Sequence, residues 1–520
     1  MTAVTGVIGA MGVADRPGRG SAFGPAFDEG DARPLIRSFL VSFFLCGRAF
    51  SWEEQAPLPP LAPRLRSFSE AMMSSRSARC VQAWLLTLLL LAGGAGGHRA
   101  AAQEPAAQPE ARPNIVILFA DDLGWGDLSS YGHPAIETPN LDRLAAQGAR
   151  FTSFYTAPVC VPSRTQLLTG RYMSRMDFQG GTGADGEGRL PPSERTLAEV
   201  LEGAGYSTHM LGKWHLGYQK EAYLPTNRGF DTWYGMPYSN DYKKPWVQTE
   251  EPLAMYQGTA DGETEIIDRD IDQSRLTTGY TRRAVERIQQ ESGKAGEPFF
   301  LYLAYNMPHL PIHTAERFRG RSGAGRYADV VETIDWSVGQ VMQALEKQGV
   351  AGRTIVVFAS DNGPWLDLPD RMLQGGNKPW HQGTTGPLRG SKQSTYEGGT
   401  RVPAILRWPG RVEAAGAGRP EREMDGKNLL PWLTGEEAQS PREQYAYVYG
   451  GELQAMRVGP WKLRLAGEEP QLFHLETDPA ARWNRAEAHP ERVERMRRRM
   501  QRYAERIGAN VPEAPRGEGR

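Results

Sequence analysis

The chain has 520 residues, of which 40% are hydrophobic and 23% charged, and its formal net charge is −1. This length suffices for one large domain and a smaller one, with cores that need no disulfide or metal to hold them. No basic stripe of the kind that nucleic-acid-binding proteins carry is visible, so no nucleic-acid partner is expected.

The first hundred residues predict a targeting segment preceded by an extension. Residues 1–71 are rich in Gly, Pro and Arg without a helical or strand period, so we expect a non-native or disordered extension, with translation starting at Met72 or Met73. Residues 72–102 have a basic start, an apolar run and a small-residue end, as in a signal peptide. The apolar run is short for a bilayer span, so export to the periplasm or the medium is favoured over a stable membrane anchor.

From residue 112 onward, apolar runs of strand length alternate with amphipathic helical stretches. Residues 114–120 (NIVILFA) are typical of a strand covered on both faces, and residues 138–150 predict a helix with Thr138 as N-cap and Gly148 closing it. Residues 298–304 and 354–360 are further strand candidates, separated by a helix over residues 327–349. The alternation predicts an α/β fold with a mixed, largely parallel sheet flanked by helices.

Beyond Pro409 the pattern changes to short β-type runs. Residues 445–449, 453–458, 462–465 and 470–475 are separated by turns and followed by an Arg-rich helix over residues 492–507. We therefore expect a catalytic domain over residues 112–412. A C-terminal subdomain over residues 413–512 would form a small antiparallel sheet with one helix.

Two of the predicted strands end in polar pairs. Asp121-Asp122 follows the first strand, and Asp361-Asn362 follows the strand over residues 354–360. Either pair alone would more often be an ordinary turn former. Because ligands gather beyond the carboxyl ends of parallel strands, the two pairs together favour a metal site, and hard oxygen ligands suit Ca²⁺ or Mg²⁺ rather than zinc.

Cys160 is the one cysteine downstream of the expected cleavage site, since Cys46 and Cys80 precede it. Pro162 is well placed to open a helix, which would put Cys160 at its positive end with Arg164 about one turn on. A helix N-terminus and an arginine make an anion site around a potential nucleophile. From these residues alone, Cys160 could be a catalytic thiolate or a buried structural cysteine.

The segment CVPSRTQLLTGR over residues 160–171 resembles the formylglycine signature of the sulfatase family, a part of the alkaline-phosphatase-like superfamily. The segments GKWHLG, PYSND, MPHLP and LRGSK are similar to further motifs, in the family's order, and the resemblance is closest to the arylsulfatase A and N-acetylgalactosamine-6-sulfatase branch. It implies catalytic roles for Cys160, Arg164, Lys213, His215, His309 and Lys392, a substrate contact by Ser239, and metal binding by Asp121, Asp122, Asp361, Asn362 and the modified Cys160.

The resemblance implies hydrolysis of sulfate esters, of sulfated carbohydrates or of aryl sulfates, whether the substrate is a small molecule or a polysaccharide. A formylglycine-generating enzyme would oxidise Cys160, and the hydrated aldehyde would attack sulfur. Three alternatives stay open: a phosphonate or phosphate ester hydrolase of the same superfamily, a non-catalytic sulfated-glycan binder, and a hydrolase that uses unmodified Cys160.

Two stretches depart from simple expectation. Related sulfatases have a longer segment where this chain passes from Gly410 to Met424 within 14 residues, so the C-terminal subdomain is shortened near residues 411–424. The loop over residues 233–246 (WYGMPYSNDYKKPW) could line a sugar or aryl pocket, although aromatic loops more often simply pack.

Overall fold

A computed structural model describes residues 112–178, 186–294, 296–409 and 423–512. The expected extension, the signal peptide and most of the shortened stretch near residues 411–424 lie outside these ranges. Within these ranges, none of the helices has both the length and the apolar character that a bilayer crossing requires.

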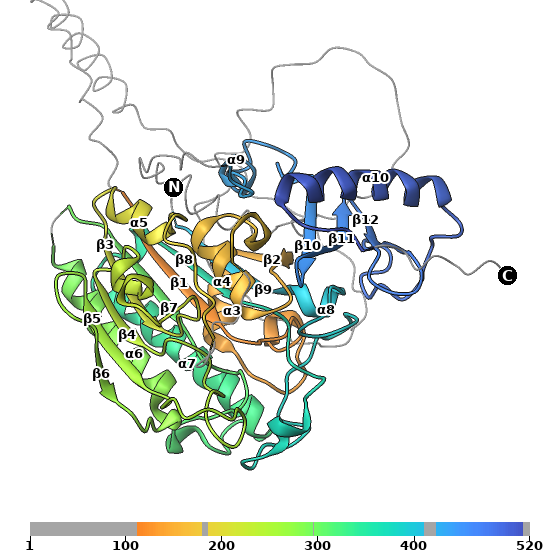
Figure 1. The fold of residues 1–520 in the computed structure, drawn as a ribbon. Coiled ribbons are helices and arrows are strands. Elements are labelled where there is room, and N and C mark those ends of the chain that lie inside the picture. The colour runs from red at the N-terminus through yellow and green to blue at the C-terminus, as the bar shows by residue number, and fades with distance from the viewer. Residues whose placement is uncertain (1–111, 179–185, 295, 410–422, 513–520) are drawn as a thin grey trace, which may run out of the picture. The chain divides into compact units, whose positions relative to one another are not determined.

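Among the described residues, nine strands form the main sheet, in the order β2-β9-β8-β1-β7-β3-β4-β5-β6 (Figure 1). The central strands β8, β1, β7, β3 and β4 are mutually parallel, whereas β2 and β9 on one side and β5 and β6 on the other pair antiparallel. The predicted mixed, largely parallel sheet is confirmed. The strands are Asn114–Ala120 (β1), Ala149–Tyr155 (β2), Ser207–Gly212 (β3), Thr232–Gly235 (β4), Met255–Thr259 (β5), Glu265–Asp268 (β6), Phe299–Ala304 (β7), Thr354–Ser360 (β8) and Arg401–Arg407 (β9).

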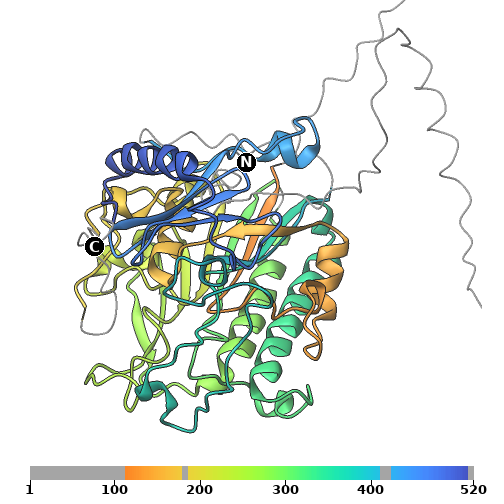
Figure 2. The ribbon, with the colours of Figure 1, turned by 90° about the vertical axis from the view of Figure 1, so that its right-hand side faces the viewer.

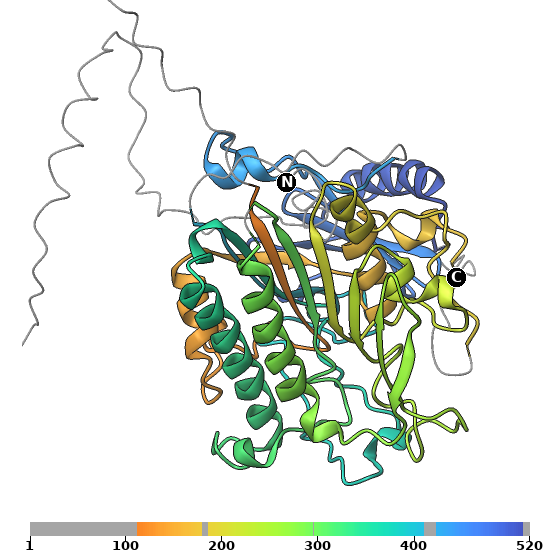
Figure 3. The same cartoon turned by 90° about the vertical axis from the view of Figure 1, so that its left-hand side faces the viewer.

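Helices cover both faces of this sheet. Val116 and Leu118 of β1 point into the core shared with α3, α6 and α7, whereas Ile115 and Ile117 point into the core shared with α4 and α5. Figure 3 shows α6 and α7 side by side along one face. The helices are Pro139–Ala146 (α3), Cys160–Thr169 (α4), Leu197–Glu202 (α5), Leu276–Ser292 (α6) and Arg326–Lys347 (α7).

The C-terminal part of the described chain forms a second, antiparallel sheet in the order β10-β11-β12-β13. Helix α10 lies along it (Figure 2) and buries Met496, Met500 and Ile507 against its strands. All four predicted β runs and the closing helix are therefore confirmed. The elements are Leu430–Thr434 (α9), Gln444–Tyr449 (β10), Glu452–Val458 (β11), Trp461–Arg464 (β12), Gln471–His474 (β13) and Pro490–Ile507 (α10).

The helix expected over residues 138–150 is shorter than predicted. It begins at Pro139 after Thr138 as expected, but it ends at Ala146, and β2 starts at Ala149. Gly148 does not close the helix. A Cβ at Gly148 would lie 2.2 Å from the carbonyl oxygen of Leu406 in β9, so this glycine permits the close approach of β2 and β9 instead.

A buried carboxylate joins the two sheets. Glu397 lies in the short helix Glu397–Thr400 (α8) and is fully buried. Its Oε1 accepts hydrogen bonds from Lys462 Nζ of β12 (2.8 Å) and Tyr447 Oη of β10 (3.2 Å), and its Oε2 accepts one from Tyr155 Oη of β2 (2.6 Å). Because a buried charge must be paired, both sheets have to be in place before Glu397 is satisfied.

Glu291 at the end of α6 ties this helix to β3. Its carboxylate lies 3.3 Å from Nε2 of His209 and 2.8 Å from Nζ of Lys294. Burial would raise the pKa of Glu291, but the hydrogen bonds from His209 and Lys294 lower it to about 2. A carboxyl whose folded-state pKa is depressed stabilises the fold above its ordinary pKa of 4.5 and loses that contribution as the pH falls toward 2.

We expect Glu291→Gln to lower the free energy of unfolding by about 2 kcal/mol at neutral pH, because the amide cannot replace the charged acceptor. The difference from wild type should shrink by more than half between pH 5 and pH 3, measured by urea denaturation. Glu286→Gln, at an exposed position of the same helix, is the matched control and should leave stability unchanged. A pH-independent difference would contradict the assignment.

Candidate active site

The carboxyl ends of β1 and β8 bring the predicted metal ligands together. The two strands pair in parallel with Ala120 opposite Ser360, so the residues that follow are neighbours. The backbone N–H of Asp122 donates to Asp361 Oδ1 (3.1 Å), and Asn362 Nδ2 donates to Asp122 Oδ1 (2.6 Å). Together with Asp121, these side chains are buried at the carboxyl ends of β1 and β8.

Cys160 is the first residue of α4, as the position of Pro162 predicts. Its Sγ lies 3.5 Å from Asp121 Oδ1, and the residue is 5% exposed. Burial, and next the charge of Asp361, raise the pKa of the Cys160 thiol well above its ordinary value. An unmodified Cys160 is therefore a protonated thiol at neutral pH, which disfavours the interpretation as a catalytic thiolate.

Three cationic side chains neutralise the buried carboxylates at these strand ends. Arg164 NH2 lies 2.9 Å from Asp361 Oδ2, and its NH1 donates to the carbonyl oxygen of Lys213. Lys213 Nζ bonds Asp121 and lies 3.2 Å from Oγ of Ser239. On the opposite side, Lys392 Nζ lies 2.8 Å from Asp122 Oδ1. The motif residues from four separate segments thus meet, which the sequence predicts.

The carboxyl groups that follow β1 and β8 differ in acidity. Burial alone would raise the pKa of Asp121, but Lys213, and next His309, hold it well below its usual range. Burial and the charge of Asp121 raise the pKa of Asp361 to about 7, although Arg164 opposes the shift. Asp361 is consequently a better proton acceptor than Asp121 in the metal-free protein.

The two predicted catalytic histidines are neutral in this arrangement. Nδ1 of His309 lies 2.6 Å from the carbonyl oxygen of Leu310, which can only accept, so Nδ1 carries the hydrogen and Nε2 is left 3.6 Å from Asp122. Burial, and next Lys392, lower the pKa of His309. Burial, and next Lys213, lower the pKa of His215 further, and its buried Nδ1 has no hydrogen-bond partner.

Part of this cluster has the geometry of a metal site. Ligand atoms of Asp121, Asp122, Cys160 and His309 lie within 4.8 Å of one another. The set of metal ligands predicted from the sequence differs from this group, because it includes Asp361 and Asn362 and does not include His309. Oδ1 of Asn362 is buried without a hydrogen-bond partner, as expected of an oxygen reserved for a cation. Carboxylate and amide oxygens fit a hard divalent ion.

Sequence reasoning missed Trp365, which lies beside the expected leaving-group residues. Its ring centroid is 5.6 Å from that of His309, and Lys392 Nζ is 4.8 Å from its centre. The residue follows the Asp361-Asn362 pair closely, but no local motif distinguishes it from an ordinary core tryptophan.

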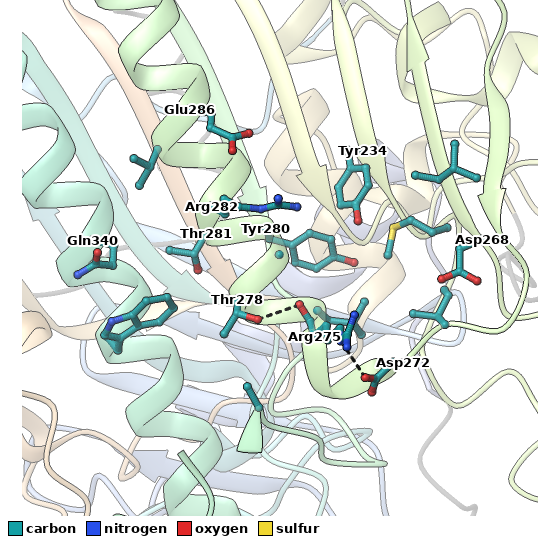
Figure 4. A pocket seen from close by; sticks show the side chains of 18 of the residues that line it. Tyr234, Asp268, Asp272, Arg275, Thr278, Tyr280, Thr281, Arg282, Glu286 and Gln340 are labelled. Atoms are coloured by element: carbon teal, nitrogen blue, oxygen red, sulfur yellow. Dashed lines mark hydrogen bonds and ion pairs between the residues drawn. The ribbon is translucent and has the colours of Figure 1, made fainter. Parts of the chain in front are cut away.

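A separate cavity of about 1100 Å³ lies between α6, α7 and the β5–β6 hairpin (Figure 4). Its wall carries both carboxylates and guanidinium groups, with Arg275 paired to Asp272 at 3.1 Å. None of the predicted catalytic or metal-binding residues is among those that line it, so this cavity is not the candidate active site.

Comparison with known proteins agrees with the fold and identifies the family. The family model Sulfatase matches residues 113–431, and the chain belongs to the sulfatase family. It is 37% identical to N-acetylgalactosamine-6-sulfatase of Mus musculus over 416 residues, covering 73% of this chain and 75% of the relative. It is 36% identical to arylsulfatase A of Bos taurus over 460 residues, covering 77% and 86%.

Among solved structures, the PsFucS1 sulfatase from Pseudoalteromonas sp. superposes with a TM-score of 0.68 at 25% identity, covering 77% of this chain and 92% of that chain. The fold is therefore that of the alkaline-phosphatase-like sulfatases, and the chain is a sulfuric ester hydrolase. The phosphonate-hydrolase and non-catalytic alternatives are not favoured.

Proposed function

We propose that this enzyme hydrolyses sulfate esters of carbohydrates, or aryl sulfates, with formylglycine made from Cys160 as the nucleophile. The observation that carries the proposal is the place of Cys160: buried at the N-terminus of α4, among three carboxylates and three cations, with a thiol too weakly acidic to act unmodified. The name of the N-acetylgalactosamine-6-sulfatase relative supports a sulfated sugar as substrate.

The ion would be Ca²⁺ or Mg²⁺, held by the carboxylates of Asp121, Asp122 and Asp361, the amide oxygen of Asn362 and residue 160. When bound, this ion would draw charge from the sulfate oxygens and favour an ionised hydroxyl on residue 160. The hydrated formylglycine supplies two hydroxyls on one carbon, one to attack sulfur and one to release the sulfate afterwards.

The remaining residues handle charge and protons. Asp361, whose charge acts directly on residue 160, would take a proton from the attacking hydroxyl. Arg164, Lys213 and Lys392 neutralise charge that builds on the sulfuryl group, with Ser239 as a hydrogen-bond donor held by Lys213. His215 is neutral and has an unpartnered buried nitrogen, so it can accept the proton released when residue 160 returns to the aldehyde.

Protonation of the leaving alcohol falls to His309, assisted by Lys392. Neutral His309 presents Nε2 as an acceptor, so it must gain a proton there before it can act as the acid. The negative charge of a bound sulfate ester favours that protonated form, which burial otherwise opposes. Lys392, whose pKa Asp122 raises against the opposing effect of burial, stays charged beside it.

We also propose the cellular setting. The segment over residues 72–102 supports export to the periplasm or the medium, and a formylglycine-generating enzyme of the host is the required partner. The division into a catalytic domain over residues 112–412 and a C-terminal subdomain over residues 413–512 belongs to the same proposal.

The first test is mass spectrometry of the tryptic peptide over residues 151–164. In active protein we expect the mass of the aldehyde form of residue 160, and Cys160→Ala should abolish turnover while it leaves the thermal midpoint close to that of wild type. Active protein in which residue 160 is wholly a thiol would overturn the proposed nucleophile.

The second test is removal of the metal. We expect a chelator to abolish activity and lower the thermal midpoint, because three carboxylates then face one another without the ion. Ca²⁺ at one hundred times its Kd should restore about 2.7 kcal/mol of stability. Asn362→Ala should weaken this Ca²⁺-dependent rise, whereas Asn377→Ala, at a buried asparagine outside the cluster, should not. A thermal midpoint insensitive to both chelator and Ca²⁺ would contradict the metal site.

The third test separates the leaving-group role of His309. His309→Ala should reduce kcat on a sugar sulfate by about 10²-fold or more, but reduce it less on nitrophenyl sulfate, whose alcohol departs without a proton. His474→Ala, in β13, is the control and should affect neither substrate. Equal losses on the two esters would remove His309 from this role.

A further inference from the structure

Three side chains that the proposed chemistry does not use gather beside its leaving-group residues. Trp365 is 6% exposed, stands against His309 and Lys392, and has a buried indole Nε1 without a hydrogen-bond partner. A buried N–H donor with no partner is costly, so its retention indicates a ligand that accepts from it.

The guanidinium of Arg371 lies 5.8 Å from the centre of the Trp365 ring. Its NH1 donates to the carbonyl oxygen of Trp246 (3.0 Å) and lies 3.4 Å from Asp241 Oδ2. The Arg371 side chain remains 43% exposed, whereas Asp241 is 4% exposed. Oδ1 of Asp241 has no hydrogen-bond partner, so a buried acceptor stands next to a half-exposed donor.

Tyr242 connects this pair to the nucleophile. Its ring packs against His215 at 6.3 Å. Burial raises the pKa of Tyr242, and the charges of Asp241, Lys213, Cys160 and Arg371 all act on its hydroxyl. Contacts also lead from Asp241 through Arg371 and Trp365 to His309, whose ligand atom lies within 4.8 Å of Cys160 Sγ.

We propose that Asp241, Arg371 and Trp365 form the subsite for the sugar ring that carries the sulfate, and that this subsite selects a neutral sugar over an acidic one. The inference rests on the proposed sulfatase function. Arg371 and the Trp365 indole can only donate hydrogen bonds, and Asp241 Oδ1 can only accept. Sugar hydroxyls do both, so neighbouring hydroxyls of one ring satisfy all three groups.

The buried charge of Asp241 sets the selectivity. A carboxylate or second sulfate on the ring would meet Arg371 but would also face Asp241, and like charges in a buried site repel strongly. It would also leave Asp241 Oδ1 without a donor, and sites built to hydrogen-bond a hydroxyl discriminate well against ligands that lack it. A site for acidic sugars would instead present Arg371 without this carboxylate.

The experiment compares kcat/KM on three esters: a sulfated neutral hexose, the hexuronate sulfated at the same position, and nitrophenyl sulfate. We expect wild type to prefer the hexose over the hexuronate by at least about ten-fold. Arg371→Ala and Trp365→Phe should raise KM for the sulfated hexose by about ten-fold or more, with a smaller effect on nitrophenyl sulfate. Asp241→Asn, which removes the charge and keeps the shape, should narrow the preference between hexose and hexuronate.

Arg275→Ala is the matched control, because Arg275 is also an exposed arginine paired with a carboxylate, in the cavity of Figure 4. It should leave all three values unchanged. A wild-type preference for the hexuronate, or an unaltered preference in Asp241→Asn, would overturn the subsite. So would equal losses on sugar and nitrophenyl esters in Arg371→Ala. Absence of turnover on all three esters in formylglycine-containing wild type is a different result, since it would reject the proposed function itself.

Discussion

The fold depends on neutralising the charges of three carboxylates that are buried together at the carboxyl ends of two strands. Asp121, Asp122 and Asp361 follow directly from two adjacent parallel strands, and each would be unstable there without an opposite charge. The cations come from α4, from the segment after β3, and from the loop before α8, so those segments must close over these strand ends for the fold to be stable. In the proposed function, the sulfate ester would bind among these cations.

The sequence predicts best those features whose pattern lies within one short segment of the chain. The continuous apolar runs of β1 and β8 identify two buried strands directly, and the motifs identify the side chains at their ends. The strands β2 and β9 on one side of the sheet and β5 and β6 on the other carry mixed patterns, and β9 contains Pro403, so neither side was predicted. Gly148 shows the same limit, since its role depends on β9, far away in the chain.

The residues of the proposed sugar subsite could not be predicted from the sequence. Arg371 and Asp241 are 130 residues apart and have no shared motif, so their pairing follows only from the folded chain. The protonation states of the site residues could not be predicted from the sequence either. That His309 carries its hydrogen on Nδ1 depends on the carbonyl of Leu310, and that Asp361 is the weaker acid depends on the neighbouring charge of Asp121.

The hydrogen-bond network around buried Glu397 can be completed only late in synthesis of the chain. Tyr155 ends the strand that leads into α4, and the hydroxyl of this tyrosine also accepts from Arg457, 302 residues further along the chain. At ribosomal rates, these residues emerge roughly 15 to 60 s apart. Until Arg457 and Lys462 appear, Tyr155 and Glu397 lack polar partners that their burial demands. The strand that leads into α4 is therefore fully satisfied only once the C-terminal sheet has formed, so a late part of the chain stabilises the segment that precedes Cys160.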